Sequence, residues 1–166
     1  MLGEAQVIER TAQPYVAIRA QVTMQTLGTV LPELHPRVFA WLGERGIPPA
    51  GAPFWKYNAI GMDRSLEVEV GVPVAAVADG DDQVLAGVLP PGPYASVRYT
   101  GHPDGLLGAT ASLLKWAEER NLAWDVRPAP EGERWGARLE IYETDPAVEP
   151  DMSKWTTQLA FRLAGQ

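Results

Sequence analysis

The chain has 166 residues, which is the length of one domain or of two small halves that share a core. It contains no cysteine, which excludes disulfides, thiolate catalysis and cysteine-based zinc sites. Its 14 basic and 21 acidic residues give a net charge of −7, which disfavours nucleic acid as a partner because a polyanion is repelled on average.

The start of the chain, MLGEAQVIERTAQ, lacks the basic segment and apolar run of a secretory signal. No apolar stretch is long enough to span a bilayer, so we expect a cytoplasmic protein with no membrane partner. The abundance of glycine and proline, 16 and 15 residues, predicts many short elements separated by turns.

Two parts of the chain carry similar segments in the same order. PYVAIR at 14–19 resembles PYASVR at 93–98, and each is followed by a helical stretch that ends in a tryptophan and a Glu-Arg pair. Two further β-prone segments follow each helix. This repetition predicts a single domain over residues 1–166, with a first repeat at about 5–76 and a second at about 83–163.

Each repeat reads as strand, helix, strand and strand. In the first repeat, regular helix is expected to begin near Pro36, because prolines crowd the preceding turn, and to end at Gly46. In the second repeat, Asp104 is a candidate N-cap for a helix at about 105–120.

A module of this kind has a helix on only one side of its sheet. Two such modules placed edge to edge about a pseudo-twofold axis would form one curved antiparallel sheet. We therefore expect an α+β fold with the helices on one face of the sheet and a ligand groove at the seam on the other face.

The strand RLEIY in the second repeat suggests what lines the groove. By parity, Leu139 and Ile141 share one face, which we expect to lie toward a helix. Arg138, Glu140 and Tyr142 then share the opposite face, which we expect to face the groove.

The repeat alignment matches Tyr57 with Tyr142 and Trp55 with Glu140. A pseudo-twofold axis would therefore bring an aromatic ring and a carboxylate from equivalent positions into one cleft. The alternative is that Glu140 is a solvated strand residue and that Trp55 belongs to the core. Spacing alone leaves both interpretations open.

A carboxylate in an aromatic cleft has two chemical uses. In its ionised form it attracts cations, which the faces of the surrounding rings attract as well. Placed near an electrophile, it can activate a water molecule.

The other polar candidates are weaker. Glu67 and Glu69 alternate with apolar residues, which is typical of a solvated strand face, although Glu69 could reach the rim of the groove. His35 reads as a surface residue at a helix start, and His102 reads as a loop residue that could face the cleft. Two histidines near different helix starts do not make a metal site, and we expect neither a metal nor a cofactor.

Several short segments together resemble the GyrI-like small-molecule-binding domain, which also serves as the effector-binding part of some AraC- and MerR-type multidrug-responsive regulators. The segments are LPPGPY before the second repeat, the Trp116 helix, LEIYE followed by Asp145 and Pro146, and the closing WTTQL. The resemblance covers about residues 5–163.

The resemblance implies a groove that binds bulky planar, often cationic compounds, with a central acid at Glu140, and hence a role in xenobiotic sequestration or resistance. Some stand-alone members of the family resemble enzymes that hydrolyse the cyclopropane of DNA-alkylating natural products. In that case Glu140, Tyr142 and Tyr57 would be catalytic. The expected ligand-binding residues are Trp55, Tyr57, Trp135, Arg138, Glu140, Tyr142, Phe39, His102 and Trp155.

The chain departs from the family pattern at two places. The entry to the second helix reads Gly101-His102-Pro103, which puts an aromatic contact in doubt there and favours His102 instead. The last strand has Thr157-Gln158 where an acidic residue is common. Because no helix-turn-helix precedes the first repeat, we do not expect a transcription factor. A gyrase-directed interaction ranks last, because the acidic residues are scattered.

Overall fold

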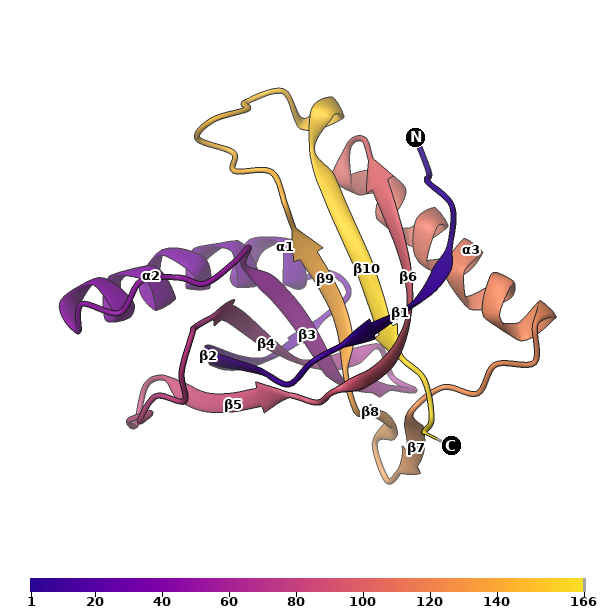
Figure 1. The fold of residues 1–166 in the computed structure, drawn as a ribbon, viewed down its shortest axis with the longest axis horizontal. Coiled ribbons are helices and arrows are strands. Elements are labelled where there is room, and N and C mark those ends of the chain that lie inside the picture. The colour runs from indigo at the N-terminus through magenta and orange to yellow at the C-terminus, as the bar shows by residue number, and fades with distance from the viewer. Residues whose placement is uncertain (166) are drawn as a thin grey trace.

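The computed structural model describes residues 1–165 and confirms the α+β fold, with one curled ten-stranded sheet and two long helices (Figure 1). The elements of the first repeat are β2 (Gln13–Thr23), α2 (Leu34–Glu44), β3 (Phe54–Gly61) and β4 (Ser65–Pro73). Those of the second repeat are β6 (Gly92–Thr100), α3 (Leu106–Glu119), β9 (Arg138–Tyr142) and β10 (Thr156–Arg162). The predicted strand-helix-strand-strand order is thus present in both halves.

Each repeat also has a leading strand, and the second has an added hairpin. The leading strands are β1 (Gln6–Arg10) and β5 (Leu85–Leu89), and the hairpin consists of β7 (Val126–Ala129) and β8 (Gly132–Trp135). Short helical turns are α1 (Leu27–Val30), η1 (Leu31–Glu33), η2 (Pro103–Gly105) and η3 (Met152–Lys154). Neither the leading strands nor the hairpin was predicted from the sequence.

The sheet has the strand order β1-β6-β10-β9-β3-β4-β2-β5, and its paired strands are antiparallel. The two repeats meet where β9 pairs with β3. At this seam Trp55 pairs with Glu140, flanked by the pairs of Phe54 with Ile141 and of Lys56 with Leu139. The two residues that the repeat alignment matched therefore lie opposite each other at the pseudo-twofold axis.

The leading strands cross between the repeats. Strand β1 of the first repeat pairs with β6 of the second, whereas β5 of the second repeat pairs with β2 of the first. Each half therefore supplies an outer strand to the sheet of the other half.

The ends of the helices follow the local sequence. The turns α1 and η1 lead directly into α2, which begins at Leu34, two residues before the expected Pro36. Gly46 follows the end of this helix with a φ of 66°. The amide of Ile47 then donates a hydrogen bond to the Leu42 carbonyl, as in a Schellman motif. Asp104 was the expected N-cap, but it lies inside η2. The N-cap of η2 is His102, whose side chain accepts a hydrogen bond from the backbone amide of Asp104.

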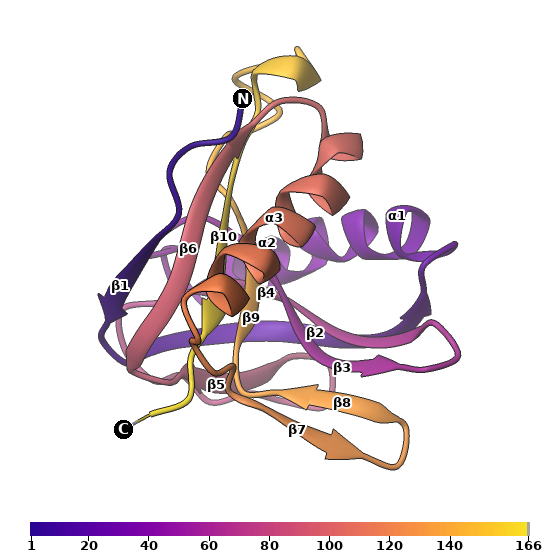
Figure 2. The same cartoon turned by 90° about the vertical axis from the view of Figure 1, so that its right-hand side faces the viewer.

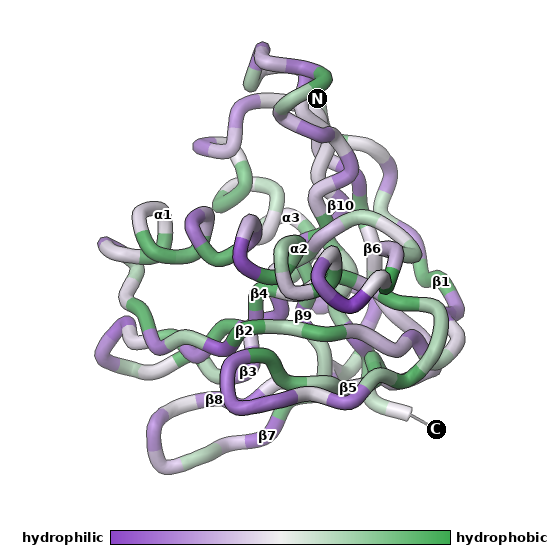
Figure 3. The backbone as a smooth tube through the Cα atoms, turned by 90° about the vertical axis from the view of Figure 1, so that its left-hand side faces the viewer, coloured by the Kyte–Doolittle hydropathy of each residue, from purple (hydrophilic) through white to green (hydrophobic). Residues whose placement is uncertain are grey.

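Both long helices lie on the same side of the sheet (Figure 2). Helix α2 packs on the first-repeat strands through a face that includes Leu34, Val38 and Leu42, and along its turns hydrophobic and hydrophilic residues alternate (Figure 3). Helix α3 packs on the second-repeat strands through Ala109 and Leu113. No helix within residues 1–165 is long and apolar enough to cross a membrane.

A third apolar cluster covers the opposite face of the sheet at the seam. Phe54, Leu139 and Ile141 are buried there, and Ile8 from β1 and Leu85 from β5 pack against them. The curl of the sheet brings the crossed outer strands over this face, so it acquires a core without a helix. The seam therefore separates an apolar cluster on one face from the side chains of Trp55 and Glu140 on the other.

Candidate functional site

Four of the expected site residues meet on one face at the seam. Trp55 and Tyr57 come from β3, and Glu140 and Tyr142 come from β9. They lie on the helix side of the sheet, because His35 of α2 contacts both Trp55 and Tyr142. All five side chains are half-buried and keep some surface open to a ligand.

This orientation corrects one expectation. The parity of the strand is as predicted, but Leu139 and Ile141 point away from the helices, into the cluster that the crossed outer strands cover. Glu140 and Tyr142 consequently face the helix side, between the areas that α2 and α3 cover. The sequence did not reveal which face of β9 is turned toward the helices, because the leading strands that cover the other face were not predicted.

The aromatic rings form a compact set. The Trp55 and Tyr142 ring centroids are 5.2 Å apart at 75°, an edge-to-face arrangement. The His35 ring stacks on Trp55 at 6.3 Å and meets Tyr142 edge-on at 6.1 Å. The indole Nε1–H of Trp55 donates to Nε2 of His35 at 2.8 Å, which fixes the Trp55 ring.

The hydrogen bond from Trp55 defines the state of His35. Because an indole nitrogen can only donate, Nε2 must accept, and the single ring proton lies on Nδ1. Burial lowers the pKa of His35 from 6.5 to about 4, so the ring is neutral at pH 7. Its Nδ1 is buried and has no hydrogen-bond partner in the described part of the chain.

Glu140 is the acid at the centre of the site. The Tyr142 hydroxyl donates to its Oε1 at 2.7 Å, and the nearby Tyr57 hydroxyl lowers the pKa of the same carboxylate. Desolvation raises the pKa of Glu140, and the two hydroxyls and the charge of Arg138 oppose this rise. Burial and the adjacent carboxylate raise the pKa of both tyrosines well above 10, so both remain hydroxyl donors.

Arg138 and Trp135 extend the site toward the second repeat. The Arg138 guanidinium lies over the rings of Trp135 and Phe161, at 4.6 and 4.7 Å from their centroids, and burial lowers the pKa of this arginine. In the described part of the chain it forms no ion pair with Glu140. The carboxylate is therefore held by the Tyr142 hydroxyl and not by an ion pair with this arginine.

The remaining expected residues have other contacts. Phe39 lies one helical turn beyond His35 on α2, and it is 38% exposed. His102 accepts the Asp104 amide at 3.1 Å through Nδ1 and is exposed. Trp155 donates its indole N–H to the Glu149 carbonyl at 2.7 Å, within the connection from β9 to β10.

His35 is the residue of the site that sequence reasoning missed. The sequence analysis treated it as a surface residue because it precedes a proline at a helix start. Its spacing contained a signal, since His35 and Phe39 lie four residues apart and project from one side of α2, next to the buried stripe of Leu34 and Val38. The packing of α2 over the seam brings His35, on this side of the helix, into contact with Trp55.

The comparisons with known proteins agree with this fold. The GyrI-like small-molecule-binding domain matches residues 4–163. No curated protein matches the sequence. The fold is similar to the EcmrR C-terminal domain, with a TM-score of 0.72 at 17% identity, with all of both chains covered. The fold is also similar to EcmrR in an EcmrR–DNA complex, with a TM-score of 0.77 at 17% identity. This match covers 98% of this chain but only 58% of the EcmrR chain.

Two further solved structures have the same fold. SAV2435 bound to tetraphenylphosphonium has a TM-score of 0.63 at 12% identity, with 98% of this chain and 94% of that chain covered. A hydrolase from Listeria innocua has a TM-score of 0.64 at 14% identity, with 97% and 92% covered. The sheet is duplicated, as the family resemblance implied, and the family match includes nearly every residue. This chain therefore belongs to the family of GyrI-like small-molecule-binding domains.

Proposed function

We propose that the protein binds bulky planar, hydrophobic or cationic molecules such as drugs and toxins at the Trp55–Tyr57–Glu140–Tyr142 site, and that it protects the cell by sequestering them. The observation that carries the proposal is a half-buried carboxylate, without a basic partner among the described residues, beside stacked aromatic rings. A flat cation would bury apolar area against the rings and satisfy the charge of Glu140 at the same time.

The neighbours are consistent with this proposal in a limited way. SAV2435 is a protein of the same fold that binds tetraphenylphosphonium, a bulky aromatic cation. At 12% identity this similarity concerns the fold only. The choice of a cation for this chain rests on its own residues, above all on Glu140.

The test is a titration of the protein with tetraphenylphosphonium and with a rhodamine dye, followed by tryptophan fluorescence. Saturation at micromolar ligand is expected, and Glu140→Gln should weaken binding by about 1–3 kcal/mol, because the charge partner of the cation is lost. Glu118→Gln, which makes the same charge change on the exposed surface of α3, is the control. The same affinity in Glu140→Gln and Glu118→Gln would contradict the proposal.

A second candidate is hydrolysis of a strained cyclopropane in a DNA-alkylating compound. The observation in its favour is that the Tyr142 hydroxyl donates to a carboxylate whose pKa is raised, and that Tyr57 is close enough to interact with the same carboxylate. Tyr57 or Tyr142 would protonate the conjugated carbonyl as the ring C–C bond breaks, and Glu140 would take a proton from the water that adds to the released carbon. The proton gained by Glu140 then restores the tyrosine, so the net reaction is the addition of one water.

Mass spectrometry separates the two functions. Incubation with a spirocyclopropane dienone should give multiple turnovers of a product heavier by one water if the protein is a hydrolase. Glu140→Gln and Tyr142→Phe should then abolish turnover while Glu118→Gln retains it. Stoichiometric recovery of unchanged ligand would contradict the hydrolase and leave the binding function.

A further inference from the structure

A cavity lies on the face of the sheet away from the helices. Its volume is about 350 Å³, and the charged side chains that line it are Arg19, Lys56, Glu67, Glu69, Asp125, Arg127 and Arg134. Lys56 belongs to β3, between Trp55 and Tyr57, which by alternation point to the other face. The cavity and the aromatic site therefore lie on opposite faces of one strand.

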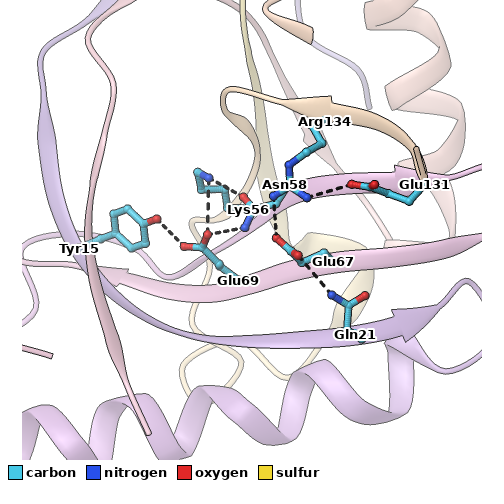
Figure 4. A network of polar contacts seen from close by, with 8 residues as sticks. All are labelled: Tyr15, Gln21, Lys56, Asn58, Glu67, Glu69, Glu131 and Arg134. Atoms are coloured by element: carbon cyan, nitrogen blue, oxygen red, sulfur yellow. Dashed lines mark hydrogen bonds and ion pairs between the residues drawn. The ribbon is translucent and has the colours of Figure 1, made fainter. Parts of the chain in front are cut away.

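The wall of this cavity is a fixed polar network built on Glu69 (Figure 4). Glu69 is only 5% exposed, although the sequence suggested a solvated face. The Tyr15 hydroxyl and the Asn58 amide donate to its two carboxylate oxygens, and Lys56 Nζ lies 3.6 Å away. The charge of Glu69 is thus balanced within the wall, as a buried carboxylate requires.

The second acid of the wall is also balanced. Arg134 Nη2 lies 3.2 Å from a Glu67 oxygen, and its Nη1 lies 3.1 Å from Glu131 (Figure 4). Gln21 donates to the other Glu67 oxygen at 3.3 Å. Neither acid of the wall therefore has charge left to attract a cation.

Two arginines of the lining have no carboxylate partner among the described residues. Arg19, from β2, and Arg127, from β7, are exposed and form no ion pair among residues 1–165. Arg127 also lies directly opposite Arg134 in the hairpin, and of these two arginines only Arg134 forms ion pairs within the described residues, with Glu67 and Glu131. The third acid of the lining, Asp125, is already held by Arg162 at 2.8 Å.

We propose that this cavity is a second ligand site, which binds a small polar molecule through a carboxylate or phosphate group held by Arg19 and Arg127. A guanidinium matches the two oxygens of either group in a bidentate fork. The volume suits a compact metabolite, and the lining is mostly charged, with Trp135 as the one aromatic side chain that it contains. This inference does not depend on the function proposed for the aromatic site.

The experiment is a ¹H–¹⁵N NMR titration of the full chain with inorganic phosphate and, separately, with succinate, at an ionic strength held constant with sodium chloride. Saturable shifts are expected for the amides of Arg127, Arg134 and Gly136, whereas the indole resonance of Trp55 should stay in place. Saturation by phosphate alone, by succinate alone or by both supports the site and identifies the preferred anion.

Variants make the assignment specific. The double variant Arg19→Gln, Arg127→Gln should weaken binding at least tenfold, and it should fold normally because both side chains are exposed. Arg37→Gln, an exposed arginine of α2, removes a positive charge elsewhere and should bind like the wild type. Non-saturating shifts with both anions, or an equal loss in Arg37→Gln, would overturn the proposal.

The outcome is separable from that of the aromatic site. Glu140→Gln should leave anion binding unchanged, since Glu140 faces the other side of the sheet. Loss of dye binding together with intact phosphate or succinate binding would identify two independent sites. Loss of anion binding in Glu140→Gln would contradict the second site.

Discussion

The hydrogen bond between Trp55 and His35 is the most informative contact at the scale of single residues. It holds the indole beside Glu140, and it requires an unprotonated Nε2 on His35. Protonation of His35 would replace this acceptor by a donor and place two N–H groups against each other. The geometry of the aromatic site is therefore tied to a neutral histidine.

The low pKa of His35 predicts a pH-dependent stability. Between pH 6.5 and about 4 the unfolded chain binds a proton at His35 that the folded chain does not, so stability falls as the pH falls through this window. Below about pH 4 both states are protonated, and this contribution stops changing. His35→Gln, whose amide oxygen can still accept from Trp55, should flatten this part of the profile in urea unfolding. His102→Gln, at an exposed position, should retain it.

The raised pKa of Glu140 predicts the pH dependence of ligand binding. Only the ionised carboxylate attracts a cation, and a bound cation in turn lowers the pKa of Glu140. The affinity for tetraphenylphosphonium should therefore rise with pH until Glu140 is fully ionised and then stay constant. Fluorescence titrations across the acidic range test this. In Glu140→Gln the dependence should disappear, and a persistent dependence would assign it to another group.

At the scale of elements, strand β4 makes room for the core under the seam. Gly71 of β4 pairs with Phe54 of β3, and the Phe54 ring covers the place where a side chain would stand. A Cβ at Gly71 would meet ring carbons at 2.6 and 2.7 Å. The close approach fixes Phe54 and, through the same strand, the position of Trp55.

A glycine pair tests this packing. Gly71→Ala should destabilise the protein by about 1–3 kcal/mol, because the added methyl forces Phe54 out of its place. Gly43→Ala, in α2 where nothing lies within 4 Å, should stabilise it by about 0.5–1 kcal/mol. Denaturant midpoints measure both changes. A neutral Gly71→Ala would show that the ring adjusts without cost.

At the scale of the whole molecule, the crossed outer strands make the halves interdependent. Without β1, the outer edge of β6 in the second repeat would be unpaired, and without β5 the outer edge of β2 would be unpaired. Unpaired edges and the exposed cluster of Phe54, Leu139 and Ile141 favour association with other chains.

This arrangement predicts fragment complementation. Residues 1–79 and 80–166, separated in the exposed connection from β4 to β5, should each be unfolded or aggregated when produced alone. Mixed during refolding, they should regain the circular dichroism and thermal transition of the intact chain. A fragment that folds alone as a stable monomer would show that the crossed strands are dispensable.

The sequence predicted the duplicated strand-helix-strand-strand order, and the alignment matched Trp55 with Glu140 as equivalent positions, which the structure pairs at the seam. It did not predict which face Glu140 takes. Alternation along a strand shows which side chains share a face, but not which of the two faces is covered. Here the covering depends on β1 and β5, which are short and partly exposed and show little hydrophobic alternation in the sequence. His35 and the burial of Glu69 were missed for a similar reason, since both depend on partners far away in the chain.

Strand β3 would be the wall common to the two proposed ligand sites. Trp55 and Tyr57 face one proposed site and Lys56 and Asn58 the other, and a β-bulge follows Tyr57. A molecule that shifts this strand on one face must change the geometry of the other. If the two occupants prefer different positions of β3, each will alter the affinity of the other by the same factor, as thermodynamic linkage requires.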